Sequence, residues 1–186
     1  MLLLVGLGNP TPNSNNNRHN IGFKVVDAIN QKFGLSKQKP KFKGLLTTGN
    51  IGEQKVYAIK PLTFMNNSGI CIRELLEYFK MDAEDVIVFH DDLDVEFGKI
   101  KAKFGGSSAG HNGIASIDKF IGKDYSRVRI GIGKPKGSIN TADYVLQNFD
   151  EEETLGIEKI SKNITESISI LVEKKLDLFS STVNNK

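Results

Sequence analysis

Residues 2–10 are Leu2-Leu3-Leu4-Val5-Gly6-Leu7-Gly8-Asn9-Pro10, and the fold class follows from this stretch and the segment after it. A short apolar run bounded by turn residues is typical of a strand buried on both faces. It is too short for a signal peptide and has no basic segment before it. Asn20 can then cap a helix whose apolar residues share one face, namely Ile21, Val25, Ile29 and Phe33. A buried strand followed by an amphipathic helix predicts an α/β protein.

Strands and helices continue to alternate along the chain. The patterns predict strands at 42–51, 55–59, 86–89, 98–104 and 127–132, and helices at 69–80, 112–121 and 151–173. A chain of 186 residues can form one domain with a full-sized core, and we expect it to span 1–181 with a frayed tail at 182–186. The loops at Gly8, His90 and Gly105 each follow a strand, at the edge where α/β sheets bind ligands.

The composition is that of an ordinary globular protein, with 39% hydrophobic and 25% charged residues. No apolar run is long enough to span a membrane, and a single cysteine excludes an internal disulfide, so we expect a cytoplasmic protein. The net charge of +3 is unevenly spread: basic residues gather in 97–136 and again in 37–43, and acidic residues in 74–96. Such segregation indicates a polyanionic partner, although a solvated surface is the more common explanation of an arbitrary lysine-rich stretch.

The three histidines share a setting, because each stands beside an amide or a carboxylate. The segments are Arg18-His19-Asn20, His90-Asp91-Asp92 and Gly110-His111-Asn112. This pattern predicts imidazoles in polar loops and not in a core. Imidazole suits proton transfer near neutral pH, and a carboxylate on its second nitrogen fixes the tautomer. The histidines therefore indicate a hydrolase.

Other chemistries fit the sequence less well. Gly6-Leu7-Gly8 lacks the third glycine of a dinucleotide-binding loop. Gly106-Ser107-Ser108-Ala109-Gly110 matches a nucleophile elbow, but the only later histidine, His111, is too close in sequence to complete a triad. Cys71 lies on an apolar helical background and is expected in the core. The histidines and Asp91 could bind zinc, but none of them has the spacing of a helical ligand pair.

Acid–base chemistry with water as the nucleophile remains. A histidine base can contribute ~10²–10⁴-fold, and an amide N–H directed at the oxyanion a further ~10²–10³-fold. Asparagines suit the second role because they stay neutral. Four of them lie at predicted junctions between loops and regular elements: Asn9, Asn20, Asn66 and Asn112.

Five motifs in this order resemble bacterial peptidyl-tRNA hydrolases. They are Val5-Gly6-Leu7-Gly8-Asn9-Pro10, Arg18-His19-Asn20-Ile21-Gly22, Lys60-Pro61-Leu62-Thr63-Phe64-Met65-Asn66-Asn67-Ser68-Gly69, His90-Asp91-Asp92-Leu93-Asp94 and Gly110-His111-Asn112-Gly113. That family cleaves the ester between a peptide and the terminal ribose of tRNA, which recycles tRNA. The resemblance implies a single mixed, mostly parallel, twisted sheet with helices on both faces. It also implies a mobile lid at 140–150 and no cofactor or metal.

By the same resemblance, His19 is the general base that activates water and Asp91 holds its imidazole. Asn66 and Asn112 hydrogen-bond the substrate and assist the oxyanion. The substrate-binding set also includes Asn9, Met65, Ser14 and His111, and Ser14 stands where the family carries a tyrosine. Lys101 and Lys103 match basic positions that meet tRNA phosphate.

Two other functions compete with this one. A non-catalytic RNA-binding protein would need no base, whereas His19 and Asp91 are both present. An esterase for small substrates would need no polyanion surface. The sequence therefore favours a peptidyl-tRNA hydrolase, with peptidyl-tRNA as its partner and water as the nucleophile. A monomer is expected alongside the resemblance, because the sequence itself does not give the oligomeric state.

Overall fold

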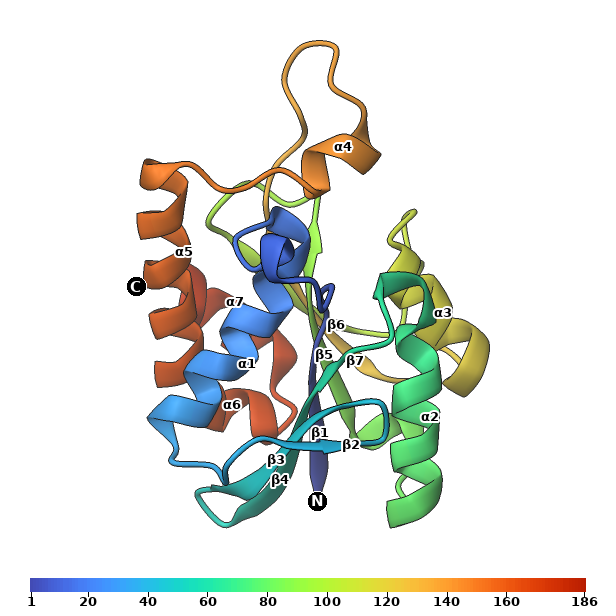
Figure 1. Ribbon diagram of the computed structural model, residues 1–186. Helices are drawn as coiled ribbons and strands as arrows, with labels where there is room; N and C mark the ends of the chain where they lie inside the picture. The colour runs from blue at the N-terminus through green and yellow to red at the C-terminus, as the bar shows by residue number, and fades with distance from the viewer.

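Strand β1 (Leu2–Gly6) lies at the centre of a seven-stranded sheet in the computed structural model, which describes residues 1–186 (Figure 1). The other strands are β2 (Lys39–Lys41), β3 (Gly44–Ile51), β4 (Gln54–Pro61), β5 (Val86–Asp92), β6 (Ile100–Phe104) and β7 (Ser126–Gly131). They are ordered β2-β3-β4-β1-β5-β7-β6. The four central strands, β4, β1, β5 and β7, are parallel. At one side of the sheet β2 and β3 pair in antiparallel fashion, β3 with β4 and β2 with β3, and at the other side β6 is antiparallel to β7. The predicted mixed sheet with a parallel centre is confirmed.

Helices cover both faces of the sheet, as predicted (Figure 1). They are α1 (Ile21–Lys32), α2 (Ser68–Phe79), α3 (Asn112–Ile121), α4 (Thr141–Val145), α5 (Glu151–Glu166), α6 (Ile168–Val172) and α7 (Leu176–Asn184). Single 3-10 turns occur at η1 (Pro12–Ser14), η2 (Arg18–Asn20), η3 (Met65–Asn67) and η4 (Ala83–Asp85). None of the helices combines the length and the apolar composition that a membrane-spanning segment requires.

The side chains of β1 point alternately to the two faces of the sheet, which explains why helices cover both faces. Leu2 and Leu4 join the core beneath α1 and α5, whereas Leu3 and Val5 join the core beneath α2 and α3. Successive side chains of a strand point to opposite faces, so an all-apolar strand needs a cover on each face. Every residue of β1 is buried.

Two glycines let α1 pack directly on β1. A Cβ atom at Gly6 would lie 2.3 Å from the carbonyl oxygen of Gly22, and one at Gly22 would lie 2.4 Å from Leu7 N. No other residue type fits such an approach of backbone to backbone. Gly6 therefore serves the packing of helix on strand, and this contact brings the start of α1 beside the end of β1.

Two local predictions were wrong because long-range packing overrides local patterns. The predicted helix 151–173 is interrupted at Ser167, which separates α5 from α6. Gly105 does not follow a strand at the ligand-binding edge, because β6 is antiparallel to β7 and ends beside Ser126, the first residue of β7. The segment from Gly105 to His111 therefore crosses from one end of the sheet to the other.

The prediction of a frayed tail was also wrong. Residues 182–184 form the end of α7, and Val183 is buried. The amide of Asn184 pairs with the backbone of β6: it accepts from Ile100 N at 2.9 Å and donates to Ile100 O at 2.9 Å. A sheet edge needs such cover, because its unpaired backbone groups otherwise invite aggregation.

We expect Asn184→Ala to lower the free energy of unfolding by about 1–3 kcal/mol, because it leaves the buried backbone groups of Ile100 without partners. Urea unfolding followed by circular dichroism measures this. Asn185→Ala is the matched control, since Asn185 is exposed one residue further on. Equal stabilities of the two variants would contradict the role of Asn184.

Candidate active site

Three segments that are far apart in the sequence meet at the carboxyl end of β5. His19 lies in η2, Asp91 lies near the end of β5, and His111 directly precedes α3. These side chains line a cleft of about 620 Å³, whose walls also include Asn112 and Val145. The fold thus brings together four residues that the sequence singled out.

Asp91 lies between two imidazoles. Its carboxylate is 2.9 Å from His19 Nδ1 and 2.9 Å from His111 Nε2, and its side chain is only 2% exposed. Burial alone would raise the pKa of Asp91, but the charges and hydrogen bonds of His19 and His111 outweigh it and hold that pKa well below its usual range. The carboxylate therefore stays ionised, and because it can only accept, both imidazoles donate to it.

His111 has a fixed tautomer, because its second nitrogen is also engaged. His111 Nδ1 accepts from Gly113 N at 3.1 Å and from Ile114 N at 3.2 Å, and so caps α3. Its proton must then lie on Nε2, facing Asp91. His19 differs, because its Nδ1 donates to Asp91 and its Nε2 has no protein partner. His19 Nε2 therefore keeps a lone pair available in the cleft.

The same geometry argues against a metal at this site. The ligand atoms of His19, Asp91 and His111 lie within 4.8 Å of one another. To bind a metal through Nε2, His111 would have to carry its proton on Nδ1, which faces the N–H groups of Gly113 and Ile114. The arrangement fits a hydrogen-bonded triad better than a zinc site.

His90 is not in a polar loop, so this part of the histidine prediction was wrong. β5 extends two residues beyond His90, which is buried, with its Nδ1 2.8 Å from the carbonyl oxygen of Asp91. Burial, together with the nearby His111, lowers the pKa of His90 to about 3. His90 is therefore a neutral core residue.

A chain of hydrogen bonds between asparagines links the His19 turn to the turn at 65–67, outside the residues that line the cleft. Asn9 N donates to Asn20 Oδ1 at 2.9 Å, and Asn20 Nδ2 donates back to Asn9 O at 2.9 Å. Asn9 Oδ1 in turn accepts from Met65 N at 2.9 Å, which fixes the turn that carries Asn66. Asn20 makes no side-chain cap on α1, contrary to prediction, because its amide is used here. Asn66 is exposed, as a group that meets substrate must be.

Ser14 does not line the cleft. It is buried, and its hydroxyl pairs with that of Thr11, because a serine is too short to reach further. Sequence reasoning also left Arg18 out of the site, and named Asn20 only as a helix cap and a junction residue. Both are direct neighbours of His19 in one motif, which was the available signal.

The two lysine-rich stretches lie at opposite sides of the sheet. Lys101 and Lys103 are on β6, and Lys39 and Lys41 are on β2. Lys101 is exposed, whereas Lys103 is half-buried beside the following loop. Lysines with a proline are common on edge strands, where they prevent pairing with other chains, and this accounts for β2. The stretch on β6 remains the candidate for phosphate contacts.

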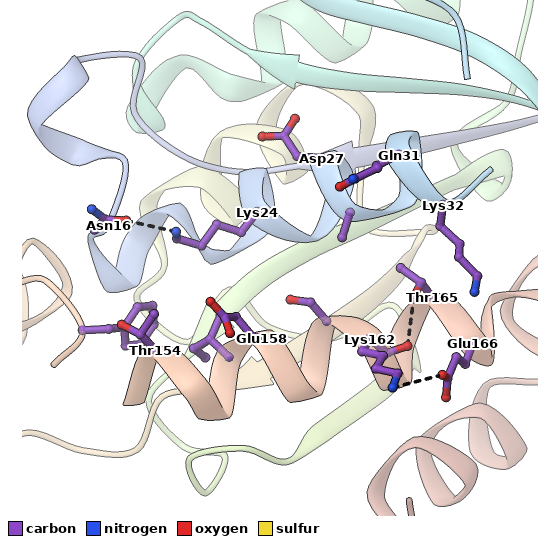
Figure 2. A pocket seen from close by; sticks show the side chains of 14 residues that line it. Asn16, Lys24, Asp27, Gln31, Lys32, Thr154, Glu158, Lys162, Thr165 and Glu166 are labelled. Atoms are coloured by element: carbon purple, nitrogen blue, oxygen red, sulfur yellow. Dashed lines mark hydrogen bonds and ion pairs between the residues drawn. The ribbon is translucent and has the colours of Figure 1, made fainter. Parts of the chain in front are cut away.

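A second cavity, also of about 620 Å³, lies between α1 and α5 (Figure 2). Its rim carries side chains of both charges, some of which pair locally, as Lys24 does with Asn16 at 3.1 Å and Lys162 with Glu166 at 4.0 Å. It contains no histidine or cysteine. The imidazoles of His19 and His111 and the carboxylate of Asp91 lie instead in the cleft described above.

Comparisons with known proteins agree on one family. The model of the family described as peptidyl-tRNA hydrolase matches residues 3–186. A peptidyl-tRNA hydrolase of Pelagibacter ubique is 80% identical over 186 residues and covers the whole of both chains. One from Bacillus subtilis is 45% identical over 160 residues, which is 86% of this chain and 85% of that protein.

Solved structures give the same result. The crystal structure of peptidyl-tRNA hydrolase from Acinetobacter baumannii superimposes with a TM-score of 0.92 at 32% identity. The match covers 99% of this chain and 94% of that one. The similarity in three dimensions thus extends over the cleft and both helical layers.

Proposed function

This chain belongs to the peptidyl-tRNA hydrolase family, and we propose that His19 is the general base with which it activates water. The enzyme hydrolyses the ester of peptidyl-tRNA and so recycles tRNA. The observation that carries the assignment is the orientation of His19, whose Nδ1 donates to Asp91 at 2.9 Å. This bond leaves Nε2 free to accept a proton from water in the cleft.

Asp91 has two tasks in this mechanism. It holds His19 in the tautomer that accepts at Nε2, and its charge stabilises the imidazolium that forms when water is deprotonated. His111 supports Asp91 with its Nε2 proton. We assign His111 to positioning, because both its nitrogens already have protein partners and neither is left to bind substrate.

Asn66 and Asn112 provide amide donors to the substrate. Both are exposed, and each lies at the start of a helical element: Asn66 in η3 and Asn112 in the first turn of α3. A neutral donor directed at the developing oxyanion is worth ~10²–10³-fold in rate. Asn9 contributes indirectly, through its bond to Met65 N, which holds the turn that carries Asn66. The Met65 side chain is buried in the core beneath α2 and α3, so we assign it to the support of this turn and not to contact with the peptide.

A single chain supplies His19, Asp91 and His111, so we assign the activity to a monomer. We assign it to the cytoplasm, because peptidyl-tRNA is a product of interrupted translation.

The decisive assay measures release of N-acetylated amino acid from its tRNA, with magnesium present to fold the RNA. A zinc-selective chelator should leave the rate unchanged. Loss of activity that zinc restores would contradict the metal-free mechanism.

We expect the double variant Lys101→Ala/Lys103→Ala to bind every tRNA more weakly than the wild type does, and by about the same factor for each tRNA. Phosphate contacts position RNA without reading its bases, and each contributes up to ~0.9 to the slope of log affinity against log salt. The slope should therefore become shallower by about one to two units, with turnover at saturation nearly unchanged. Fluorescence anisotropy with labelled tRNA at several salt concentrations measures it.

The matched control for this test is Lys39→Ala/Lys41→Ala, which removes two exposed lysines from the opposite side of the sheet. Its salt slope should equal that of the wild type. If only the control variant changed the slope, tRNA would bind along β2 and not along β6.

A further inference from the structure

Arg18, the residue before His19, is a buried cation with contacts on every side. Its Nη2 donates to the Glu153 carboxylate at 3.0 and 3.3 Å, and its guanidinium lies 4.2 Å above the Tyr144 ring. Its Nε is buried without a partner. Its Nη1 donates to the carbonyl oxygens of Tyr144 and Asn148, both at 3.4 Å, so the end of α4, the segment after it and α5 hold the guanidinium together.

The backbone around Arg18 is paired with the same region. Arg18 N donates to Gln147 O at 3.0 Å, and Phe149 N donates to Asn16 O at 3.1 Å. An isolated antiparallel bridge between Asn17 and Asn148 lies between these bonds. The residues before His19 thus form a short two-stranded contact with residues 147–149, which connect α4 to α5.

Glu153 extends this connection into α5. Its side chain accepts from Asp150 N at 3.1 Å while Asp150 accepts from Glu153 N at 2.7 Å, the reciprocal cap of a helix N-terminus. One carboxylate therefore serves both the cap of α5 and Arg18. Movement of Arg18 would disturb the beginning of this helix.

α4 is also a wall of the cleft. Thr141, Ala142 and Val145 line the same cavity as His19. Tyr144 faces away from it, beneath Arg18, and its hydroxyl donates to Ile132 O at 2.8 Å. The ring thus joins the wall of the cleft to the turn that carries the base.

We propose that Arg18 is a positioning residue that fixes the end of α4 and residues 147–149 to the His19 turn, so that the base and the cleft wall keep one relative placement. Motion of the lid expected at 140–150 is then confined to the part before Tyr144. The proposal rests on His19 being the base. Correct placement of a base matters because a displacement of about 1 Å can cost ~10²-fold in rate.

The test uses Arg18→Gln, Arg18→Lys and Glu153→Gln in the full chain. Arg18→Gln should lower kcat by ~10- to ~10²-fold and leave the affinity for deacylated tRNA within about twofold. Arg18→Lys keeps the charge but lacks the planar fork, so it should recover only part of the loss. Because Arg18 and Glu153 act in one contact, the double variant Arg18→Gln/Glu153→Gln should have a kcat little lower than that of Arg18→Gln alone.

Hydrogen exchange separates this proposal from the assignment of His19, because it needs no activity. Amides of residues 16–18 and 147–149 should exchange faster together in Arg18→Gln and in Glu153→Gln. Lys60→Gln is the matched control: Lys60 is also a buried cation paired with a carboxylate, Asp27, at 2.7 Å, and it lies near an aromatic ring. The Lys60→Gln variant should be less stable than the wild type, with an unchanged kcat and unchanged exchange rates at these amides.

Two results would overturn the proposal. One is a kcat within twofold of the wild type although the amides of 147–149 exchange faster, because the wall would then be irrelevant to the base. The other is unchanged exchange at these amides in Arg18→Gln. If that variant does not fold, the same readouts on Arg18→Lys and Glu153→Gln decide the question.

Discussion

His19→Ala should lower turnover of peptidyl-tRNA by at least ~10²-fold while tRNA binding stays nearly intact. The substitution removes the only imidazole nitrogen of the site that has no protein partner, and it removes no phosphate contact. Asp91 keeps its bond to His111 at 2.9 Å, so the site should remain folded. Single-turnover hydrolysis, with anisotropy for binding and circular dichroism for folding, measures these quantities.

Added imidazole gives this prediction a second readout. It can occupy the space of the missing ring and accept a proton from water, so it should restore part of the rate in His19→Ala and have no effect on the wild type. The assignment of the base would be refuted by near wild-type turnover in the variant.

Asp91→Asn should lower turnover by about 10²- to 10⁴-fold, because it places the wrong tautomer on His19. An asparagine has one acceptor and one donor where Asp91 has two acceptors. His111 cannot reverse its tautomer without losing the cap of α3, so it retains the oxygen. The new amide N–H then takes the place of the other oxygen, 2.9 Å from His19 Nδ1, while the retained oxygen lies 3.0 Å from the same nitrogen. The N–H opposes a proton on Nδ1 and so favours the tautomer of His19 with its proton on Nε2, which has no lone pair to accept from water.

The pH dependence of Asp91→Asn provides the check. Without the negative charge the imidazolium form of His19 is less stable, so the acid limb of the residual pH–rate profile should move to lower pH. In the wild type this limb does not arise from Asp91, whose pKa is held well below its usual range. Nitrogen NMR reports the tautomer of His19 directly. A profile that stayed in place would show that Asp91 is not the partner of His19.

The sign of the linked stability follows from the same pKa. A carboxyl group whose pKa is lower in the folded state stabilises the protein at pH values above ~3.9, the pKa of an aspartate in the unfolded chain. This stabilisation is lost only as the pH falls below that value. Mildly acidic pH should therefore not destabilise the fold through Asp91, which thermal unfolding at several pH values measures.

The sequence by itself determined the elements whose signals are local. The apolar run of β1 and the helical spacing of α1 predicted a buried strand and a covering helix, because burial on two faces or on one stripe leaves a periodic pattern. The five motifs identified the family and named His19 and Asp91. Each of these conclusions depends on neighbouring residues and needs no knowledge of which distant segments meet.

Tertiary structure alone decided the rest. The direction of β6, the burial of His90, the break at Ser167 and the docking of Asn184 on β6 depend on partners far along the chain. The tautomer of His111 required both Asp91 and the start of α3 to be in place. Hydrogen bonds and burial are properties of contacts in space, so a pattern of residue types can nominate an imidazole but cannot say what its two nitrogens face.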